Sequence, residues 1–335
     1  MVAALCAMQA QDYLGAKWAI GLRAPGVQDG DVEQALNDGL ILRTHVLRPT
    51  WHFVTPDDIR WLIALTAPRV HSANAYYYRQ ADLDAKVFAK SCAMMHRALD
   101  GGKAMTRAEL AEHLKRAHIP AEGIKLAYVM MHAELEGVIC SGPRRGKQST
   151  YMLLDERAPQ KKKTPPREEA LAELAKRYFT SHGPATVKDF SWWSGLTIAE
   201  AQTAVTDVRP RLESTTVGGL THWNADTSPA RLHHGSSAYL LPNYDEYLIG
   251  YKDRAPVVDE ARAANIVARS NGGFANHLII DGRLAGSWSR TLQSNAALIE
   301  VAPYKKLTPP QVRAIAGAAD CYGEFLGVPA SMVVV

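Results

Sequence analysis

Three times in succession along the chain, stretches with helical periodicity are followed by two short β-type stretches that a turn connects. In the first pair, Pro49 lies in the turn and supplies the fixed φ angle that a turn requires. The predicted hairpins comprise residues 40–47 with 51–54, 138–140 with 150–154, and 212–216 with 220–223. Helices followed by a two-stranded hairpin form the order of a winged helix, so the sequence predicts three such motifs in tandem.

The starts of several helices are marked by capping residues. Thr106 and Glu109 form a Thr-x-x-Glu capping box, which predicts a helix over residues 107–117. Thr186 is expected to cap a helix over residues 187–193, and Thr197 is expected to begin another. In the former helix, Trp192 and Trp193 are expected to belong to the core.

After Pro229 the sequence becomes rich in β-type stretches, with Asp281-Gly282 as a two-residue hairpin signal. The predicted strands are residues 239–241, 247–249, 277–280, 283–288 and 296–301, and a closing helix spans 310–326. The fold class is therefore α+β, with tandem winged-helix motifs followed by a small, partly open β-barrel-like domain. The predicted domains are 1–84, 85–164 and 165–228, each a winged-helix unit, and 229–335, the β-barrel-like domain.

Composition excludes several classes of protein. Among 335 residues there is no uncharged apolar run long enough to cross a bilayer, so we expect a soluble cytoplasmic protein. The four cysteines lie far apart, and the twelve histidines include no His-Glu-x-x-His pattern. No disulfide framework, no metal site and no cofactor is therefore predicted. A formal charge of +4 permits a polyanionic partner without requiring one.

Near the N-terminus, Gln9 and Gln11 are separated by one small residue. Side chains two positions apart share a face only on an extended segment, where Asp12 would point to the other side. A pair of primary amides can hold and orient a water molecule without acting as a strong base. Such chemistry is useful only where the bond under attack is already weak. The alternative interpretation is an exposed polar pair without a function.

The tip of the second hairpin carries Arg144, Arg145 and Lys147 near two glycines. Backbone amides and cationic side chains at such a tip can approach phosphates, although a charged tip can equally be a solvated turn. We expect these three residues to contact DNA phosphates and to add affinity with little base discrimination.

Several separate segments together resemble the AlkZ/YcaQ family of winged-helix DNA glycosylases, and the resemblance extends over essentially the whole chain. The residues that carry it are 8–13, 48–54, 240–254, Asp281-Gly282-Arg283 and Gly286-Ser287-Trp288. The resemblance implies tandem winged-helix motifs and a C-terminal β-barrel around a DNA-binding cleft. Relatives usually have roughly one more helix ahead of the glutamine motif, whereas eight residues precede Gln9 here.

The resemblance also implies a function: removal of purines alkylated at N7 or N3 from double-stranded DNA by water attack on the N-glycosidic bond. The catalytic Gln-aliphatic-Gln of the family maps onto Gln9 and Gln11. Because relatives with Asp at the second position act on simpler lesions, Gln11 places this chain nearer the members that unhook interstrand crosslinks. Arg48, Trp51 and His52 could line the same cleft as DNA contacts, or could equally serve hairpin packing. Asp12, Tyr244 and Asp245 are further candidates for the cleft, and a structural turn is an equal alternative for Tyr244 and Asp245.

The alternative function is a non-catalytic winged-helix regulator that binds DNA, and a second rival is a catalytically silent paralogue that senses or caps damage. Winged-helix regulators read bases with a helix in the major groove. The candidate helix, residues 124–135, offers chiefly Lys125, His132 and Glu134 as polar groups, which is a poor set for reading bases. We therefore favour a monofunctional glycosylase, acting as a monomer on DNA in the cytoplasm and associated with the nucleoid.

Overall fold

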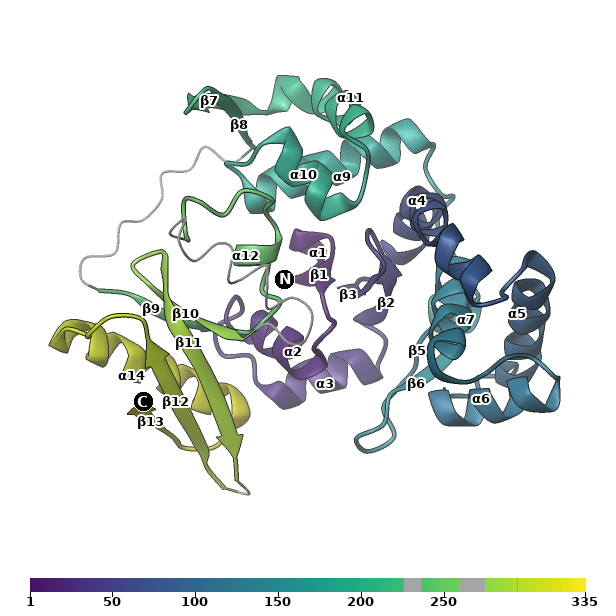
Figure 1. Ribbon diagram of the computed structural model, residues 1–335, viewed down its shortest axis with the longest axis horizontal. Coiled ribbons are helices and arrows are strands. Elements are labelled where there is room, and N and C mark those ends of the chain that lie inside the picture. The colour runs from purple at the N-terminus through teal and green to yellow at the C-terminus, as the bar shows by residue number, and fades with distance from the viewer. Residues whose placement is uncertain (226–235, 259–274, 294) are drawn as a thin grey trace. The chain divides into compact units, whose positions relative to one another are not determined.

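The computed structural model describes residues 1–225, 236–258, 275–293 and 295–335, and it shows a mixed α and β fold (Figure 1). Contacts divide the chain into two compact units whose segments alternate along the sequence. The helical unit contains Val2–Gln9 and Gln34–Asp226. The sheet unit contains Met1, Ala10–Glu33 and Thr227–Val335. Within the described residues, no helix is both long and apolar enough to span a membrane.

In the helical unit, the first hairpin is confirmed and gains a third strand from the N-terminus. Strand β1 pairs with β3, and β3 pairs with β2, both in antiparallel register. Helix α4 packs on β2. The bounds are α1 Val2–Leu5, β1 Met8–Gln9, β2 Leu42–Val46, β3 Thr50–Val54 and α4 Ile59–Gln80. Helix α3 Asp29–Asn37 begins in the sheet unit and ends in the helical unit. The extended conformation predicted for the glutamine motif is confirmed at Gln9.

The second repeat follows the predicted order of helices and then a hairpin, and the loop of the hairpin projects away from the helices (Figure 1). The capping box of Thr106 and Glu109 is present in both directions, so the start of α6 is confirmed. The bounds are α5 Ala85–Leu99, β4 Met105–Thr106, α6 Arg107–Arg116, α7 Gly123–Leu135, β5 Ile139–Ser141 and β6 Thr150–Leu153.

The third repeat has the same order, and Thr186 and Thr197 both cap helices as predicted. Its core is aromatic: Tyr178, Phe179 and Phe190 are fully buried beside Trp193. The bounds are α8 Leu154–Arg157, α9 Arg167–His182, α10 Val187–Ser194, α11 Ile198–Val208, η1 Arg209–Arg211, β7 Glu213–Val217 and β8 Leu220–Asn224.

The sheet unit is built on one five-stranded sheet in the order β13-β12-β11-β10-β9, and α14 packs against it (Figure 1). Only β12 and β13 pair in parallel among its described strands. Among the described strands the two edges, β13 and β9, do not pair with each other, so the sheet is not closed, in agreement with the predicted partly open form. The bounds are α2 Tyr13–Gly21, β9 Ala238–Leu241, α12 Glu246–Ile249, β10 Asn276–Ile280, β11 Arg283–Leu292, β12 Ala297–Pro303, α14 Pro309–Leu326 and β13 Ala330–Val334.

Three features of the sheet unit differ from the sequence-based expectation, and one of them is strand β13, which the sequence did not predict. Residues 247–249, expected to form a strand, instead lie in α12. The Asp245 side chain accepts a hydrogen bond from the Tyr247 N–H at 2.9 Å, which caps the start of a helix. In addition, α2 joins this unit, because the Trp18 indole donates to the Leu240 carbonyl at 2.6 Å and packs on Tyr322. The four-domain division stays a prediction.

Candidate active site

Gln9 lies on the edge strand β1 of the three-stranded sheet in the helical unit. It is directly opposite His52 of β3, which is in turn opposite Thr44 of β2. Residues opposite each other in antiparallel strands share one face of the sheet, so these three side chains form a row. Gln9 is only 8% exposed, and His52 and Thr44 are fully buried. The strand pairing therefore holds the Gln9 backbone in place.

Arg48 fixes the Gln9 amide. Its Nη2 donates to Gln9 Oε1 at 3.1 Å. Because a guanidinium only donates, the atom that faces it must be the amide oxygen, and the amide is thereby oriented. Arg48 lies in the turn between β2 and β3, where Leu47 adopts a positive φ of 61°. A hydrogen bond from the Leu47 N–H to Thr66 Oγ1 at 3.0 Å stabilises this turn.

Trp192 of α10 completes this group. The Arg48 guanidinium carbon lies 5.8 Å from the centre of the Trp192 ring, a cation–π contact. The close approach depends on Gly195, which has a φ of 73° and where a Cβ would collide with the Leu47 carbonyl oxygen. Only glycine satisfies both conditions. We call Gln9, Arg48 and Trp192 the Gln9 cluster.

The expectation for the tryptophan pair is half right. Trp193 is fully buried, as predicted, whereas Trp192 is 43% exposed and is not a core residue. Successive residues on a helix point about 100° apart, and Trp193 faces the core whereas Trp192 faces away from it. Periodicity alone did not distinguish the two, because adjacent aromatic residues can both be buried, as Tyr178 and Phe179 of α9 are.

Gln11 and Asp12 belong to the sheet unit. Gln11 is exposed and lies in a bend just before α2. Asp12 is the N-cap of α2, and its Oδ1 accepts a hydrogen bond from the Gly15 N–H at 3.2 Å. This carboxylate, a possible cleft group by sequence, therefore has a structural task at the start of the helix.

The other hairpin candidates serve packing. Trp51 neighbours His52 on β3 and so points to the face opposite Gln9. Its Nε1 donates to the fully buried Glu134 at 3.3 Å, and its ring packs on His45 at 4.5 Å between centroids. The Nδ1 of His52 lies 3.0 Å from the Thr50 carbonyl. The structure thus brings Arg48, but not Trp51, to Gln9.

The cationic hairpin tip is tied to its surroundings. Arg145 Nη1 pairs with Glu109 Oε1 at 2.7 Å, and Arg145 Nη2 donates to the Ala104 carbonyl at 2.8 Å. The backbone hydrogen bond from Thr106, together with Arg145, lowers the pKa of Glu109 to about 2. The Arg144 N–H donates to Asn37 Oδ1 at 2.8 Å. Its guanidinium donates to the Lys147 carbonyl. Lys147 itself is exposed.

Tyr244 and Asp245 lie in a segment that carries the family resemblance. Asp245 is fully buried, and its two oxygens accept from Arg23 Nη1 and Nη2 at 2.8 and 2.6 Å. With the Tyr247 N–H as a third donor, this carboxylate serves the structure of the sheet unit. Tyr244 is half-buried, and its N–H donates to Asn243 Oδ1 at 3.0 Å.

The thiol closest in sequence to the Gln9 cluster is Cys6. Burial raises its pKa to about 12, against the weaker opposing effect of Arg177. The group is therefore a neutral thiol at physiological pH, and a thiolate nucleophile is not available at this position.

Comparison with known proteins identifies the family. A profile of the family described as DNA glycosylase AlkZ-like matches residues 2–325, and the chain belongs to this family. The interstrand DNA cross-link repair glycosylase of Streptomyces sahachiroi is 26% identical over 307 residues, which cover 86% of this chain and 81% of that protein. The solved structure of Streptomyces sahachiroi DNA glycosylase AlkZ covers 99% of this chain and 92% of its own, with a TM-score of 0.78 at 23% identity. The family resemblance seen in the sequence is confirmed.

Proposed function

We propose that this chain excises N7- and N3-alkylated purines from duplex DNA, and unhooks interstrand crosslinks, by water attack on the N-glycosidic bond. Membership of the glycosylase family gives the reaction class. The oriented Gln9 amide is the observation that carries the mechanism. The name of the Streptomyces sahachiroi relative supports crosslinks as substrates.

The chemistry suits a neutral amide. Alkylation at N7 or N3 makes the purine cationic, so the base leaves as a neutral molecule and needs no proton from an acid. The sugar gains positive charge as the bond breaks, and the remaining task is to place a water molecule beside it. An amide oxygen can accept two hydrogen bonds, so the bond from Arg48 does not exclude a water on Gln9 Oε1.

Selectivity follows from the weakness of this catalyst. One preorganised hydrogen bond in an active site contributes roughly 3–4 kcal/mol to a transition state. That amount is too little to break the bond to an undamaged base but enough to assist a bond that is already weakened. We assign Gln9 and Gln11 to water positioning and contact with the lesion, and Arg48 to positioning of Gln9. The reaction needs no cofactor.

Trp192 adds a surface for nucleic acid. Its partly exposed ring lies next to the cation that holds Gln9. Stacking of a base on an aromatic side chain is sequence-tolerant and contributes about 1–3 kcal/mol per base. We therefore propose that Trp192 contacts a nucleotide near the lesion. The repeated order of helices and hairpins supports three winged-helix motifs as the DNA-binding scaffold.

The experiment for this proposal is excision from a defined duplex. The protein is incubated with DNA that carries one N7-methylguanine, and abasic sites are scored with and without alkaline cleavage. We expect strand breaks only after alkali, which is the result for a monofunctional hydrolase, and none from the same duplex with guanine. A duplex crosslinked by a bifunctional alkylating agent should, after incubation, run as separate single strands on a denaturing gel.

Tight binding to one undamaged sequence without excision of any lesion would instead support the regulator. Helix α7 argues against that outcome. Its Glu134 is fully buried against His45 and Trp51, and its His132 stacks on Phe88. These polar groups are turned into the protein, where they cannot read bases. We further propose that the chain acts as a monomer on DNA in the cytoplasm, associated with the nucleoid.

The hairpin tip should contribute to DNA affinity through charge. We expect the double variant Arg145→Ala with Lys147→Ala to flatten the dependence of log affinity on log salt by about 0.9 for each phosphate that the variant no longer neutralises. The slope is measured by fluorescence anisotropy over a range of salt concentrations. Lys90→Ala, an exposed cation on α5, is the matched control. A slope equal to that of wild type would show that Arg145 and Lys147 do not contact DNA phosphates. Arg144 is spared because its side chain holds the tip together.

A further inference from the structure

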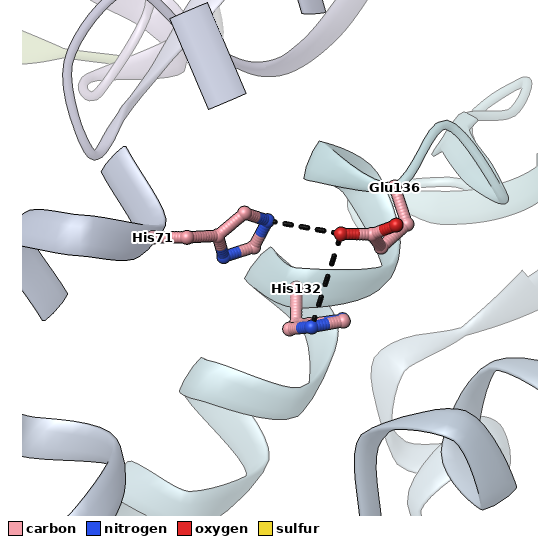
Figure 2. Close-up of side chains that lie close together, drawn as sticks. All are labelled: His71, His132 and Glu136. Carbon is pink, nitrogen blue, oxygen red and sulfur yellow. Dashed lines mark ion pairs between the residues drawn. The ribbon is translucent and has the colours of Figure 1, made fainter. Parts of the chain in front are cut away.

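Two histidines and a glutamate that are far apart in the sequence meet between α4 and α7 (Figure 2). His71 lies on α4, His132 lies on the last turns of α7, and Glu136 directly follows α7. One potential ligand atom from each lies within 4.8 Å of the other two. Glu136 Oε1 is 3.1 Å from His71 Nε2 and 3.9 Å from His132 Nε2.

The two imidazole rings present the same nitrogen to the carboxylate. The Nδ1 of His71 is 3.3 Å from the Tyr78 hydroxyl, and the Nδ1 of His132 is 3.9 Å from the Cys92 sulfur. Both Nε2 atoms are thereby directed at Glu136. Metal-bound histidines usually engage their second ring nitrogen with such a polar neighbour, which sets the orientation of the ring.

The rings are also held in place by aromatic packing. His132 stacks on Phe88 with the ring centres 3.9 Å apart. The rings of His71 and His132 pack on each other with their centres 4.8 Å apart. This packing limits the orientations that both imidazoles can adopt.

We propose that His71, His132 and Glu136 bind one divalent transition-metal ion, with zinc as the best fit, and so link α4 to α7. Zinc favours imidazole nitrogen and carboxylate oxygen at about 2.0–2.2 Å in a tetrahedral arrangement. Ligand atoms in such a site are roughly 3.3 Å apart. The distance of 3.1 Å between His71 Nε2 and Glu136 Oε1 already fits, whereas the His132 ring must move closer by about an ångström or less. A water molecule would be the fourth ligand.

The surroundings allow an ion to enter. Glu136 is exposed, with 49% of its side chain accessible. A cavity of about 390 Å³ is lined by His71, Glu136, Pro68, Gln160 and Thr164 among others. The ion would link α4, which follows the first hairpin, to α7, which precedes the second hairpin. This role is structural and is separate from the Gln9 cluster.

Zinc binding to the full-length protein tests the proposal. The protein is stripped with a chelator, dialysed and titrated with zinc chloride in a calorimeter. We expect one equivalent with a dissociation constant below about 1 µM and a zinc-dependent rise of several degrees in the melting temperature. The Co²⁺-loaded protein should show the visible absorption of a tetrahedral site.

Glu136→Gln and His71→Ala should each weaken zinc binding by at least about 100-fold and abolish the rise in melting temperature. His96→Ala, on the exposed side of α5, should bind as wild type does. Since Glu136 is exposed, Glu136→Gln keeps the test valid even where His71→Ala fails to fold. Absence of zinc binding by wild type, or undiminished binding by Glu136→Gln, would mean that the three residues form an ordinary His–Glu ion-pair cluster.

Discussion

Gln9→Ala is expected to lower the single-turnover rate of N7-methylguanine excision by about 100- to 1000-fold, the effect of removing one preorganised hydrogen-bonding group from an active site. Affinity for the lesion-bearing duplex should change little, because phosphate contacts dominate binding to DNA. The rate is measured with enzyme in excess, by alkaline cleavage at the abasic site. Melting temperature is recorded for each variant, since Gln9 is largely buried.

Gln11→Ala should reduce the rate within the same range. If both glutamines act on one water molecule, the excision rate of the double variant should be only slightly below that of the slower single variant. The effects of residues that act as a unit are not additive. Gln202→Ala, an exposed glutamine on α11, is the matched control and should retain the wild-type rate. A rate for Gln9→Ala within about threefold of wild type would exclude the amide from the transition state.

The second large effect is on stability. Asp245→Ala is expected to lower the free energy of unfolding by about 3–5 kcal/mol, because it leaves the partly buried Arg23 guanidinium without its counter-charge. The change also removes the acceptor that caps α12 through the Tyr247 N–H. Urea unfolding followed by circular dichroism measures the difference.

Asp320→Asn, at an exposed position on α14, provides the comparison and should change the free energy of unfolding by less than about 0.5 kcal/mol. A decrease below about 1 kcal/mol for Asp245→Ala would show that the ion pair does not hold the sheet unit together. The family resemblance leaves Asp245 open as a cleft residue, and this measurement tests its structural role.

The local structure of the helical unit was readable from the sequence because its determinants lie within a few residues of one another. The capping box of Thr106 and Glu109 spans a single turn, and its hydrogen bonds form wherever a helix begins there. Turn residues such as Pro49 act over a similar range. The extended segment at Gln9 depends instead on pairing with the distant strand β3, although its place in the family motif indicated the reaction class.

Residues 247–249 mark the limit of this local reading. Three apolar or aromatic residues suit a strand or a short helix equally well, and periodicity alone does not choose between them. The hydrogen bond from the Tyr247 N–H to Asp245 caps a helix at this position and so favours the helix over a strand. The Asp245 side chain is in turn held by Arg23, which is 222 positions away in the sequence. A contact between distant segments thus set a local conformation.

The sequence by itself determined the order of helices and hairpins, the partly open sheet and the family, since these depend on local periodicity, capping and motif order. Only the tertiary structure decided that Arg48 holds the Gln9 amide, that Trp192 rather than Trp193 is exposed, and that His71 meets His132 and Glu136. Each of these features depends on which distant segments of the chain pack against one another. Residue patterns over a few positions do not specify that packing.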